Sequence, residues 1–290
     1  MIANITIDQA IATYDALLFD AFGVLVNANS ALPGAIELIN RLNTENYEYY
    51  ILTNGASLTL ELTQKRYLAK GLNIPIERII SSGSLIKNWF AKNELTGANC
   101  YVIGPATSHE LILEAGGRIV DTSTKQVKVF AICDQSNMKF PEEINHIISL
   151  IFQLIDSGQT PRMLVPNPDL IYPASEGKFA ITSGSIAEMI ERILLTRYPT
   201  KTNLKFERLG KPFSPIFEEA FKKTKTLNMA LIGDQLITDV AGANKFGIDS
   251  ILIGTGITKI VDSNKDSFST ELLQNGSPHC IPKYYLKNLL

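Results

Sequence analysis

The stretch "LLFDAFGVLV", residues 17–26, is an apolar run that a single acid, Asp20, interrupts. The residues before Asp20 have the continuous apolar character of a buried strand, and Gly23 follows three positions later. An acid at the end of such a strand is either an ordinary turn residue or a group with a chemical role. The rest of the chain has to decide between these two interpretations.

Strand-like and helix-like segments alternate on both sides of this stretch. Residues 33–46 and 58–73 have helical spacing, with Pro33 near the start of the first and Gly71 closing the second. Strands are predicted within 47–57, 78–84, 229–234 and 250–256. Strands that are separated by helices of this length pair in parallel, which predicts an α/β, Rossmann-like parallel-sheet core.

The middle of the chain has its own set of elements. Strands are predicted within residues 100–104, 117–121, 127–134 and 162–169, and a long amphipathic helix within 141–158. The simplest organisation is a core made of residues 1–85 and 200–290 that is interrupted by an inserted α/β cap domain of residues 86–199.

The composition excludes several classes of protein. The chain has 290 residues, 45% of them hydrophobic and 19% charged, and a formal net charge of −2. These values are those of an ordinary globular protein and give no reason to expect nucleic acid or a membrane as partner. No apolar stretch approaches the ~20 residues of a membrane span. Three widely spaced cysteines and an acidic N-terminal segment favour a cytoplasmic protein.

Polar residues gather where the predicted core elements end. In a parallel α/β sheet these ends meet at one edge, so the residues are expected to lie close together. A carboxylate nucleophile, two acids for Mg²⁺, a hydroxyl-and-amide turn and a lysine suit attack on a phosphoryl group. The residues concerned are Asp20, Thr53, Asn54, Lys211, Asp234 and Asp239.

Four segments resemble, in order and spacing, the motifs of haloacid dehalogenase superfamily hydrolases. They are "LLFDAFGVL" (17–25), "ILTNGAS" (51–57), "RLGKPFSP" (208–215) and "LIGDQLITDVAGA" (231–243). The segments "LPGA", "SSGS" and "NPDLIYP" are similar to those of subfamily IIA, which carries a large cap between the second and third motifs. That subfamily contains nitrophenyl phosphatase-like, N-acetylglucosamine-6-phosphatase-like and pyridoxal phosphatase-like enzymes.

The resemblance implies roles for the residues that match the motifs. Asp20 would be the nucleophile that forms an aspartyl-phosphate, and Lys211 would neutralise Asp20 and the phosphate. The turn of Thr53, Asn54 and Gly55 would bind the phosphoryl group.

The same resemblance implies a Mg²⁺ site. Asp20, Asp234 and the backbone carbonyl of Phe22 would be ligands of the ion, and Asp239 would hold a metal-bound water or position Lys211.

Phe22 departs from the phosphatase pattern. Phosphatases of the superfamily have a second aspartate at this position, which protonates the leaving oxygen and activates the water. An aromatic residue there resembles the dehalogenase version of the motif, yet dehalogenation needs no metal and would leave "GDQLITD" (233–239) without a purpose. Two main hypotheses therefore stay open: a Mg²⁺-dependent phosphatase with slow or selective turnover, and a phospho-ligand-binding regulatory protein.

The predicted cap supplies the remaining candidates. Asp134 and Asp169 could replace the missing acid, and Asn167 and Asp169 could contact the ligand or only shape a turn. The resemblance also implies a homodimer formed through the cap. A small phosphorylated metabolite is the expected ligand.

Overall fold

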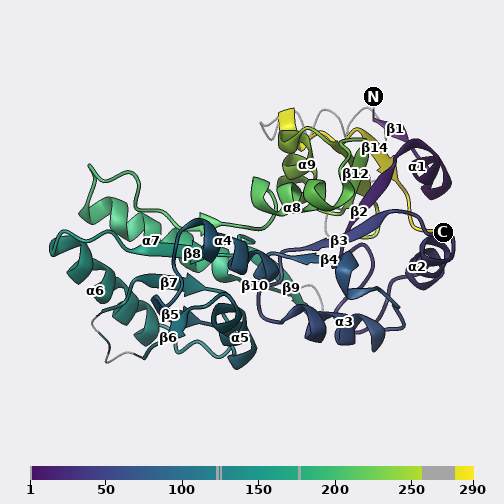
Figure 1. Cartoon of the computed structure of the whole chain (residues 1–290). Coiled ribbons are helices and arrows are strands. Elements are labelled where there is room, and N and C mark those ends of the chain that lie inside the picture. Colours follow the sequence, from purple (N-terminus) through teal and green to yellow (C-terminus); the bar gives the residue numbers. More distant parts are fainter. Residues whose placement is uncertain (1, 122–123, 125, 176–177, 257–277) are drawn as a thin grey trace. The chain divides into compact units, whose positions relative to one another are not determined.

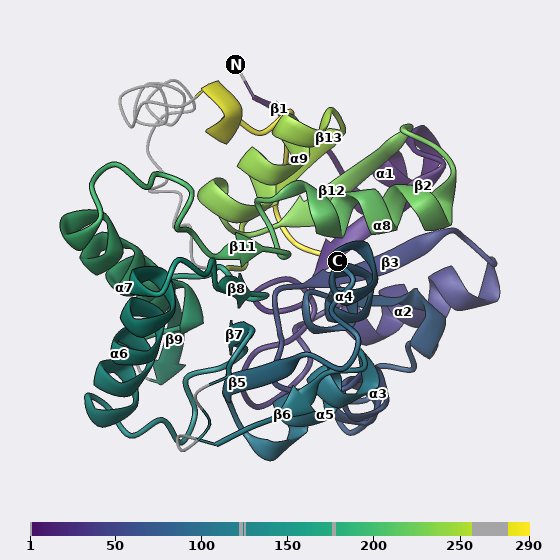
Figure 2. The same ribbon diagram turned by 60° about the vertical axis from the view of Figure 1, so that its left-hand side comes forward.

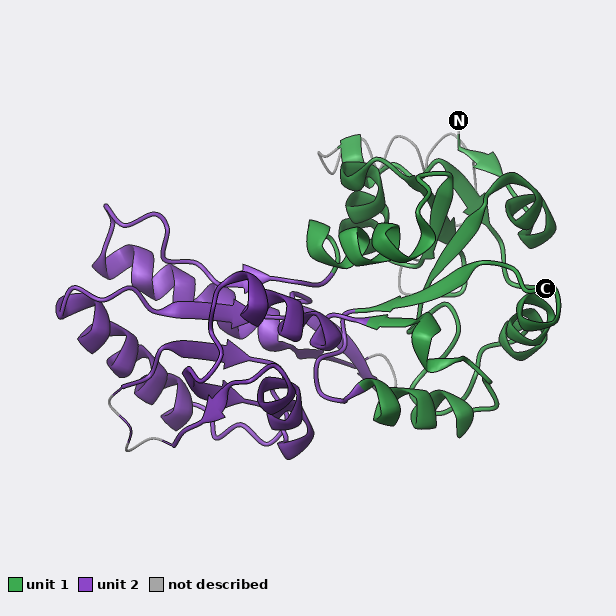
Figure 3. Ribbon diagram, viewed as in Figure 1, with its two compact units in different colours: residues 1–53, 60–80, 211–290 green, residues 54–59, 81–210 purple. Residues whose placement is uncertain are grey.

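The computed structural model describes residues 2–121, 124, 126–175, 178–256 and 278–290. The chain divides into two compact units, coloured separately in Figure 3. Unit 1 consists of residues 1–53, 60–80 and 211–290, and unit 2 of residues 54–59 and 81–210. The predicted domain boundaries near residues 85 and 200 stay a prediction, and residues 257–277 of the predicted core lie outside the described residues.

Unit 1 contains a sheet in which the described strands have the order β1-β14-β13-β12-β2-β3-β4 (Figure 1). The pairs from β1 through to β3 are all parallel, with Phe19 opposite Ile232 and Asp20 opposite Leu52. The strands are β1 (Ala3–Asn4), β2 (Ala16–Asp20), β3 (Tyr49–Thr53), β4 (Ile79–Ser81), β12 (Met229–Gly233), β13 (Asp249–Ile253) and β14 (Tyr284–Leu286).

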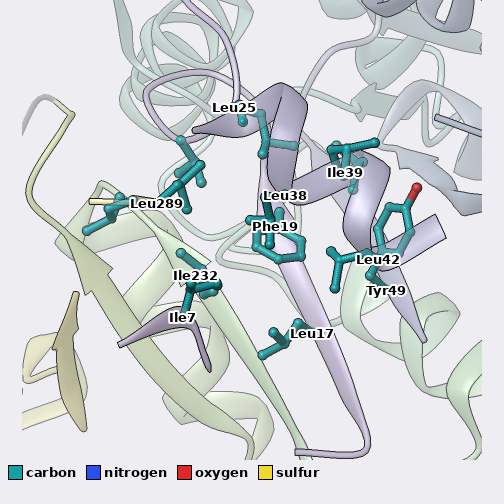
Figure 4. Close-up of a cluster of buried hydrophobic side chains, with 14 of the residues drawn as sticks. Ile7, Leu17, Phe19, Leu25, Leu38, Ile39, Leu42, Tyr49, Ile232 and Leu289 are labelled. Carbon is teal, nitrogen blue, oxygen red and sulfur yellow. The ribbon is translucent and has the colours of Figure 1, made fainter. Parts of the chain in front are cut away.

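Helices cover this sheet and bury its apolar residues. Leu17 and Phe19 of β2 point into one cluster with Ile232 of β12 and with Leu38 and Leu42 of α2 (Figure 4). All five side chains are nearly or completely inaccessible to solvent, as expected of a doubly covered parallel sheet. The helices of unit 1 are α1 (Ile7–Thr13), α2 (Ala35–Thr44), α3 (Leu60–Leu68), α8 (Ser214–Thr224) and α9 (Ala241–Phe246).

The strand order changes direction between β2 and β12. From β2 the chain proceeds to β3 and β4 on one side, and from β12 it proceeds to β13 and β14 on the other. Open α/β sheets bind their ligands at such a switch point, beyond the carboxyl ends of the strands. The topology therefore locates a site beyond the ends of β2 and β12.

Unit 2 has a sheet of its own, in the order β11-β8-β7-β5-β6, with parallel pairs throughout. Helices α6 and α7 pack together on one face, where they bury a second apolar cluster (Figure 2). The strands are β5 (Asn99–Ile103), β6 (Arg118–Ile119), β7 (Val129–Ile132), β8 (Arg162–Val165) and β11 (Glu207–Arg208). The helices are α4 (Ile86–Lys92), α5 (Ala106–Glu114), α6 (Glu142–Asp156) and α7 (Ser183–Arg197).

A separate antiparallel hairpin of β9 (Ile171–Ser175) and β10 (Lys178–Ile181) completes unit 2. The predicted α/β fold class with a Rossmann-like parallel-sheet core is confirmed. The hairpin and the short edge strands β1 and β14 are absent from the sequence-based prediction, because too few residues alternate in them. Among the described residues, no helix is long and apolar enough to cross a membrane.

Candidate active site

Three of the predicted site residues stand at the carboxyl ends of adjacent strands. Asp20 is the last residue of β2, Thr53 is the last residue of β3, and Asp234 directly follows β12. Because β2 lies between β3 and β12, the sheet itself brings these residues to one edge. This position matches the switch point of the strand order.

Lys211 lies between two of the acids. Its Nζ atom is 2.6 Å from Asp20 Oδ1 and 2.7 Å from Asp239 Oδ1. Both contacts are charge-assisted and short, and the lysine side chain is only 3% exposed. The structure thus joins the beginning of the chain, the segment after unit 2 and the segment after β12 in one network.

Asp239 also organises the loop that follows β12. It lies in a π-helical turn, Leu236–Val240, and its Oδ2 atom accepts hydrogen bonds from the backbone N–H groups of Asp234 (3.2 Å) and Gln235 (3.1 Å). One oxygen of Asp239 therefore contacts Lys211 and the other fixes the backbone of Asp234.

The charges of this group do not cancel. We call Asp20, Lys211, Asp234 and Asp239 the acid–lysine cluster; its four members are all buried. Burial raises the pKa of Asp20 well above its ordinary value, and the charges of Asp239 and Asp234 add to this effect, while Lys211 lowers that pKa. Burial alone would lower the pKa of Lys211, but the charges of Asp20 and Asp239 raise it above its ordinary value.

Three acids facing one lysine form a set of donors that suits a hard cation. One carboxylate oxygen from each of Asp20, Asp234 and Asp239 lies within 4.8 Å of the others. Oxygen ligands are those that Mg²⁺ and Ca²⁺ prefer, and a buried excess of negative charge is stabilised by a cation.

Glycines allow the backbone to approach the acids closely. A Cβ atom on Gly23 would lie 2.3 Å from Asp234 Oδ2, and one on Gly256 would lie 2.1 Å from the same oxygen. Gly23 also has a φ of +87°, in the left-handed region that favours glycine. On the other side of the loop, a Cβ on Gly233 would lie 2.3 Å from Asp239 Cβ. The acids are therefore enclosed by backbone that tolerates no side chain.

The phosphate-binding turn that the sequence predicts spans the boundary between the units. Thr53 closes β3 in unit 1, and Asn54 and Gly55 are the first residues of unit 2. Phe22 lies two residues beyond Asp20, with its side chain 36% exposed and its backbone bridged to Val26.

The candidates from the predicted cap lie in unit 2. Asp134 follows β7, and its Oδ1 atom accepts a hydrogen bond from Ser136 N at 2.7 Å. Asn167 follows β8, and its Oδ1 atom accepts one from Asp169 N at 3.0 Å. Asp169 in turn accepts a hydrogen bond from the side chain of Asn54 at 2.8 Å. Each of these three side chains is thus engaged in a local contact within its own unit.

Two residues of the site are absent from the sequence-based prediction. Gly256 belongs to the segment "GTG", which carries no signal beyond that of a turn after a strand. Tyr67 is buried in α3, and burial, together with the charge of Asp20, raises its pKa. A tyrosine on an amphipathic helix looks like a core residue, so no pattern in the sequence selects it.

Comparison with known proteins places this site in a family. A family model described as haloacid dehalogenase-like hydrolase matches residues 17–118, and a second, HAD-hydrolase-like model matches residues 208–279. Dihydroxyacetone phosphatase of Corynebacterium glutamicum is 27% identical over 83% of this chain and 81% of its own. Ribonucleotide monophosphatase NagD of Escherichia coli is 25% identical over 88% of this chain and 94% of its own. The chain is a haloacid dehalogenase-like hydrolase, and the curated relatives that it matches are phosphatases.

A solved structure extends this similarity over the whole chain of the hydrolase. A protein from Cytophaga hutchinsonii, described as a "possible sugar phosphatase, HAD superfamily", superposes with a TM-score of 0.84 and 28% identity, covering 100% of this chain and 99% of its own. The resemblance inferred from the four motifs is confirmed, and so is the prediction that the chain is an enzyme of the hydrolase class.

Removal of the lysine should destabilise the hydrolase. In Lys211→Met, two buried carboxylates lose their common cation, and breaking a buried ion pair costs about 3–5 kcal/mol. Chemical denaturation followed by circular dichroism measures the free energy of unfolding. Lys222→Met is the control, because Lys222 is 67% exposed and 3.6 Å from Glu219, and a surface pair contributes about 0–1 kcal/mol. Equal losses in the two variants would contradict this account of the cluster.

Proposed function

We propose that this hydrolase cleaves phosphomonoesters of small metabolites by attack of the Asp20 carboxylate on phosphorus. The observation that carries the proposal is the contact of Lys211 Nζ with Asp20 Oδ1 inside a buried group of acids. A carboxylate at the end of a central strand is a rigidly held nucleophile. Phosphoryl transfer needs little beyond such positioning and stabilisation of charge.

Mg²⁺ is the cation that we propose for the site. Asp20, Asp234 and the backbone carbonyl of Phe22 would be its ligands. Asp239 would hold a metal-bound water or position Lys211. The oxygen donors and the excess of buried negative charge support this choice. When bound, the ion neutralises charge on the phosphoryl oxygens.

The residues of the chain carry the two chemical steps. In the first, Asp20 forms a bond to phosphorus as the bond to the leaving oxygen breaks, and the leaving oxygen takes a proton from solvent. In the second, water attacks phosphorus, gives a proton to solvent and breaks the bond to Asp20, which releases inorganic phosphate and restores the carboxylate. Lys211 stabilises the charge on the transferring group, and Asp239 holds Lys211. Thr53 and the backbone amides of Asn54 and Gly55 would bind the phosphoryl oxygens.

Phe22 decides which leaving groups are favoured. Its side chain can neither protonate the leaving oxygen nor activate water, and general acid–base catalysis contributes roughly 10²–10⁴-fold to a rate. Aryl and acyl phosphates, whose leaving groups need little protonation, should therefore react fastest. Asp134 is then the candidate for supplying a proton to other substrates, whereas the carboxylate of Asp169 accepts a hydrogen bond from Asn54.

The curated relatives support the class of substrate. Their names specify dihydroxyacetone phosphate and ribonucleotide monophosphates, and a third relative is named acid sugar phosphatase. These compounds share a phosphate ester on a small polar metabolite, which is the class that we propose here.

Two alternatives lead to different observations. A regulatory protein would bind a phosphorylated ligand in the same cluster with no efficient turnover, which the absence of an acidic side chain at position 22 favours. A dehalogenase would attack carbon through Asp20 and would have no use for a cation beside Asp234 and Asp239. The buried acids therefore weigh against the second alternative.

Hydrolysis of p-nitrophenyl phosphate, with and without Mg²⁺, tests the proposed activity. We expect wild-type turnover that requires the ion and is lost in Asp20→Asn, because the amide is not a nucleophile. Phe22→Asp should raise the rate for alkyl phosphates more than for the aryl ester, since only the former need an acid. An inactive wild type with an active Phe22→Asp variant would favour the regulatory alternative. No hydrolysis by wild type, Asp20→Asn or Phe22→Asp with Mg²⁺ bound would exclude the phosphatase.

A matched pair of glycine variants tests the metal site. In Gly23→Ala, the new methyl group would displace Asp234, and we expect Mg²⁺ affinity to fall about 10–100-fold, as for residues that support metal ligands. Gly247→Ala is the control, because Gly247 has a similar φ of +91° with nothing within 4 Å of the added Cβ. Isothermal titration calorimetry measures both. Equal affinities would show that Asp234 does not hold the ion.

We propose further that a second copy of the chain covers the β9–β10 hairpin. Both strands of this hairpin are edge strands among those described, and large apolar side chains are exposed on or beside it. Exposed apolar surface of this kind marks an interface. The side chains are Leu170, Ile171, Tyr172, Phe179 and Ile181.

Light scattering after gel filtration tests the dimer. We expect wild type to elute as two chains of 32.0 kDa and Phe179→Glu as one, because the new charge would be buried in the interface. Leu227→Glu, at an equally exposed position in unit 1, should stay dimeric. A monomeric wild type at tens of micromolar would refute the proposal.

A further inference from the structure

The segment that enters unit 2 after Thr53 is tied down at successive backbone carbonyls. Ser82 Oγ donates to Asn54 O at 2.6 Å, and Gly83 N donates to Gly55 O at 3.2 Å. The next two carbonyls, those of Ala56 and Ser57, accept hydrogen bonds from Ser108 Oγ and Thr107 Oγ1. Four consecutive peptide groups therefore have fixed orientations.

The side chain of Asn54 is fixed as well. Its Nδ2 atom donates to Asp169 Oδ1 at 2.8 Å, a hydrogen bond between residues 115 positions apart. Asp169 is itself immobilised, because its N–H donates to Asn167 Oδ1 at 3.0 Å and its carbonyl accepts from Gly184 N at 3.1 Å. Asp169 is thus a fixed acceptor for a side chain of the predicted phosphate-binding turn.

A second contact reaches Asn54 from the segment that leaves unit 2. A Cβ atom on Gly210 would lie only 2.4 Å from Asn54 Oδ1, so the amide oxygen occupies the space that a side chain would need. Gly210 N donates to Pro166 O at 3.0 Å, which holds this segment beside the "NPD" turn. Gly210 immediately precedes Lys211, and Asn54 immediately follows Thr53.

We infer that Asp169 is a positioning residue that acts through Asn54, and that Asn54, Asp169 and Gly210 together fix the two ends of unit 2, which adjoin Thr53 and Lys211 in the chain. The inference rests on the proposed phosphatase function and gives a role to an acid for which the sequence leaves three roles open: a ligand contact, a proton donor and a turn residue. Asp169 fixes one side of the Asn54 amide and Gly210 fits against the other. The residue that follows Thr53 and the residue that precedes Lys211 are thereby held against each other.

This role differs from direct contact with the substrate in what substitutions should do. The hydrogen bond needs only an oxygen acceptor at Asp169, which the amide of Asp169→Asn supplies and the methyl group of Asp169→Ala does not. A proton donor or a charge that recognises the ligand would be lost equally in both variants. Gly210→Ala disturbs the same amide from the opposite side and leaves Asp169 unchanged.

The kinetics of p-nitrophenyl phosphate hydrolysis distinguish the two roles. We expect Asp169→Ala and Gly210→Ala each to lower kcat about 10²-fold, the effect of misplacing reacting groups by about 1 Å, while KM changes less than about threefold. Asp169→Asn should keep kcat within about fivefold of wild type, because it retains the acceptor. The double variant should be little worse than either single one, because both remove the same constraint. Asp156→Asn, an acid at the end of α6 that contacts Arg197 and Tyr198, is the control.

Loss of activity in Asp169→Asn as large as in Asp169→Ala, or a loss carried by KM, would overturn the inference. Hydrogen–deuterium exchange of peptides covering Gly83, whose N–H donates to Gly55 O, gives a readout that needs no turnover. Exchange should be faster in Asp169→Ala and Gly210→Ala and unchanged in Asp169→Asn. Unchanged exchange in the first two variants would refute the constraint itself, whereas faster exchange in a protein without phosphatase activity would refute only the proposed function.

Discussion

The ammonium group of Lys211, held between Asp20 and Asp239, is the interaction on which the rest of the site depends. Three carboxylates cannot be buried together without compensation, because each loses its hydration. Lys211 supplies one positive charge, and the backbone N–H groups of Asp234 and Gln235 add hydrogen bonds to the Asp239 carboxylate. Three carboxylates against one ammonium group give the cluster a net negative charge when all four are ionised, and such a cluster favours a cation.

The topology of unit 1 explains why these residues meet at all. Asp20 and Asp234 follow strands that are neighbours in the sheet but far apart in the chain, with the whole of unit 2 between them. The reversal of strand order leaves a position between β2 and β12 that no connection covers. Glycines at positions 23 and 256 then let the backbone close around Asp234. The site is therefore a consequence of strand order and of missing side chains as much as of the acids.

The same topology determines what could be predicted from the sequence. The strands before Asp20, Thr53 and Asp234 are continuous apolar runs, and parallel pairing brings their ends to one edge, so the fold class and the grouping of Asp20 with Asp234 could be predicted. The contact of Asn54 with Asp169 could not, because it depends on how two distant turns are folded within unit 2. Gly256 and Tyr67 have no local pattern that distinguishes them from an ordinary turn glycine and a core tyrosine.

In the phosphatase that we propose, Phe22 separates two tasks that phosphatases of the superfamily usually combine. Stabilising charge on a transferring phosphoryl group requires the cation site, Lys211 and the turn after Thr53, and every residue type for these tasks is present. Protonation of the leaving group requires a titratable side chain beside the nucleophile, and the phenyl group of Phe22 is not titratable. A site of this composition can still accept a phosphoryl group from a good leaving group at little cost, while an alkoxide leaving group costs it roughly 10²–10⁴-fold. Such an enzyme would distinguish substrates by how readily their leaving group departs without a proton, independently of its contacts with the remainder of the substrate.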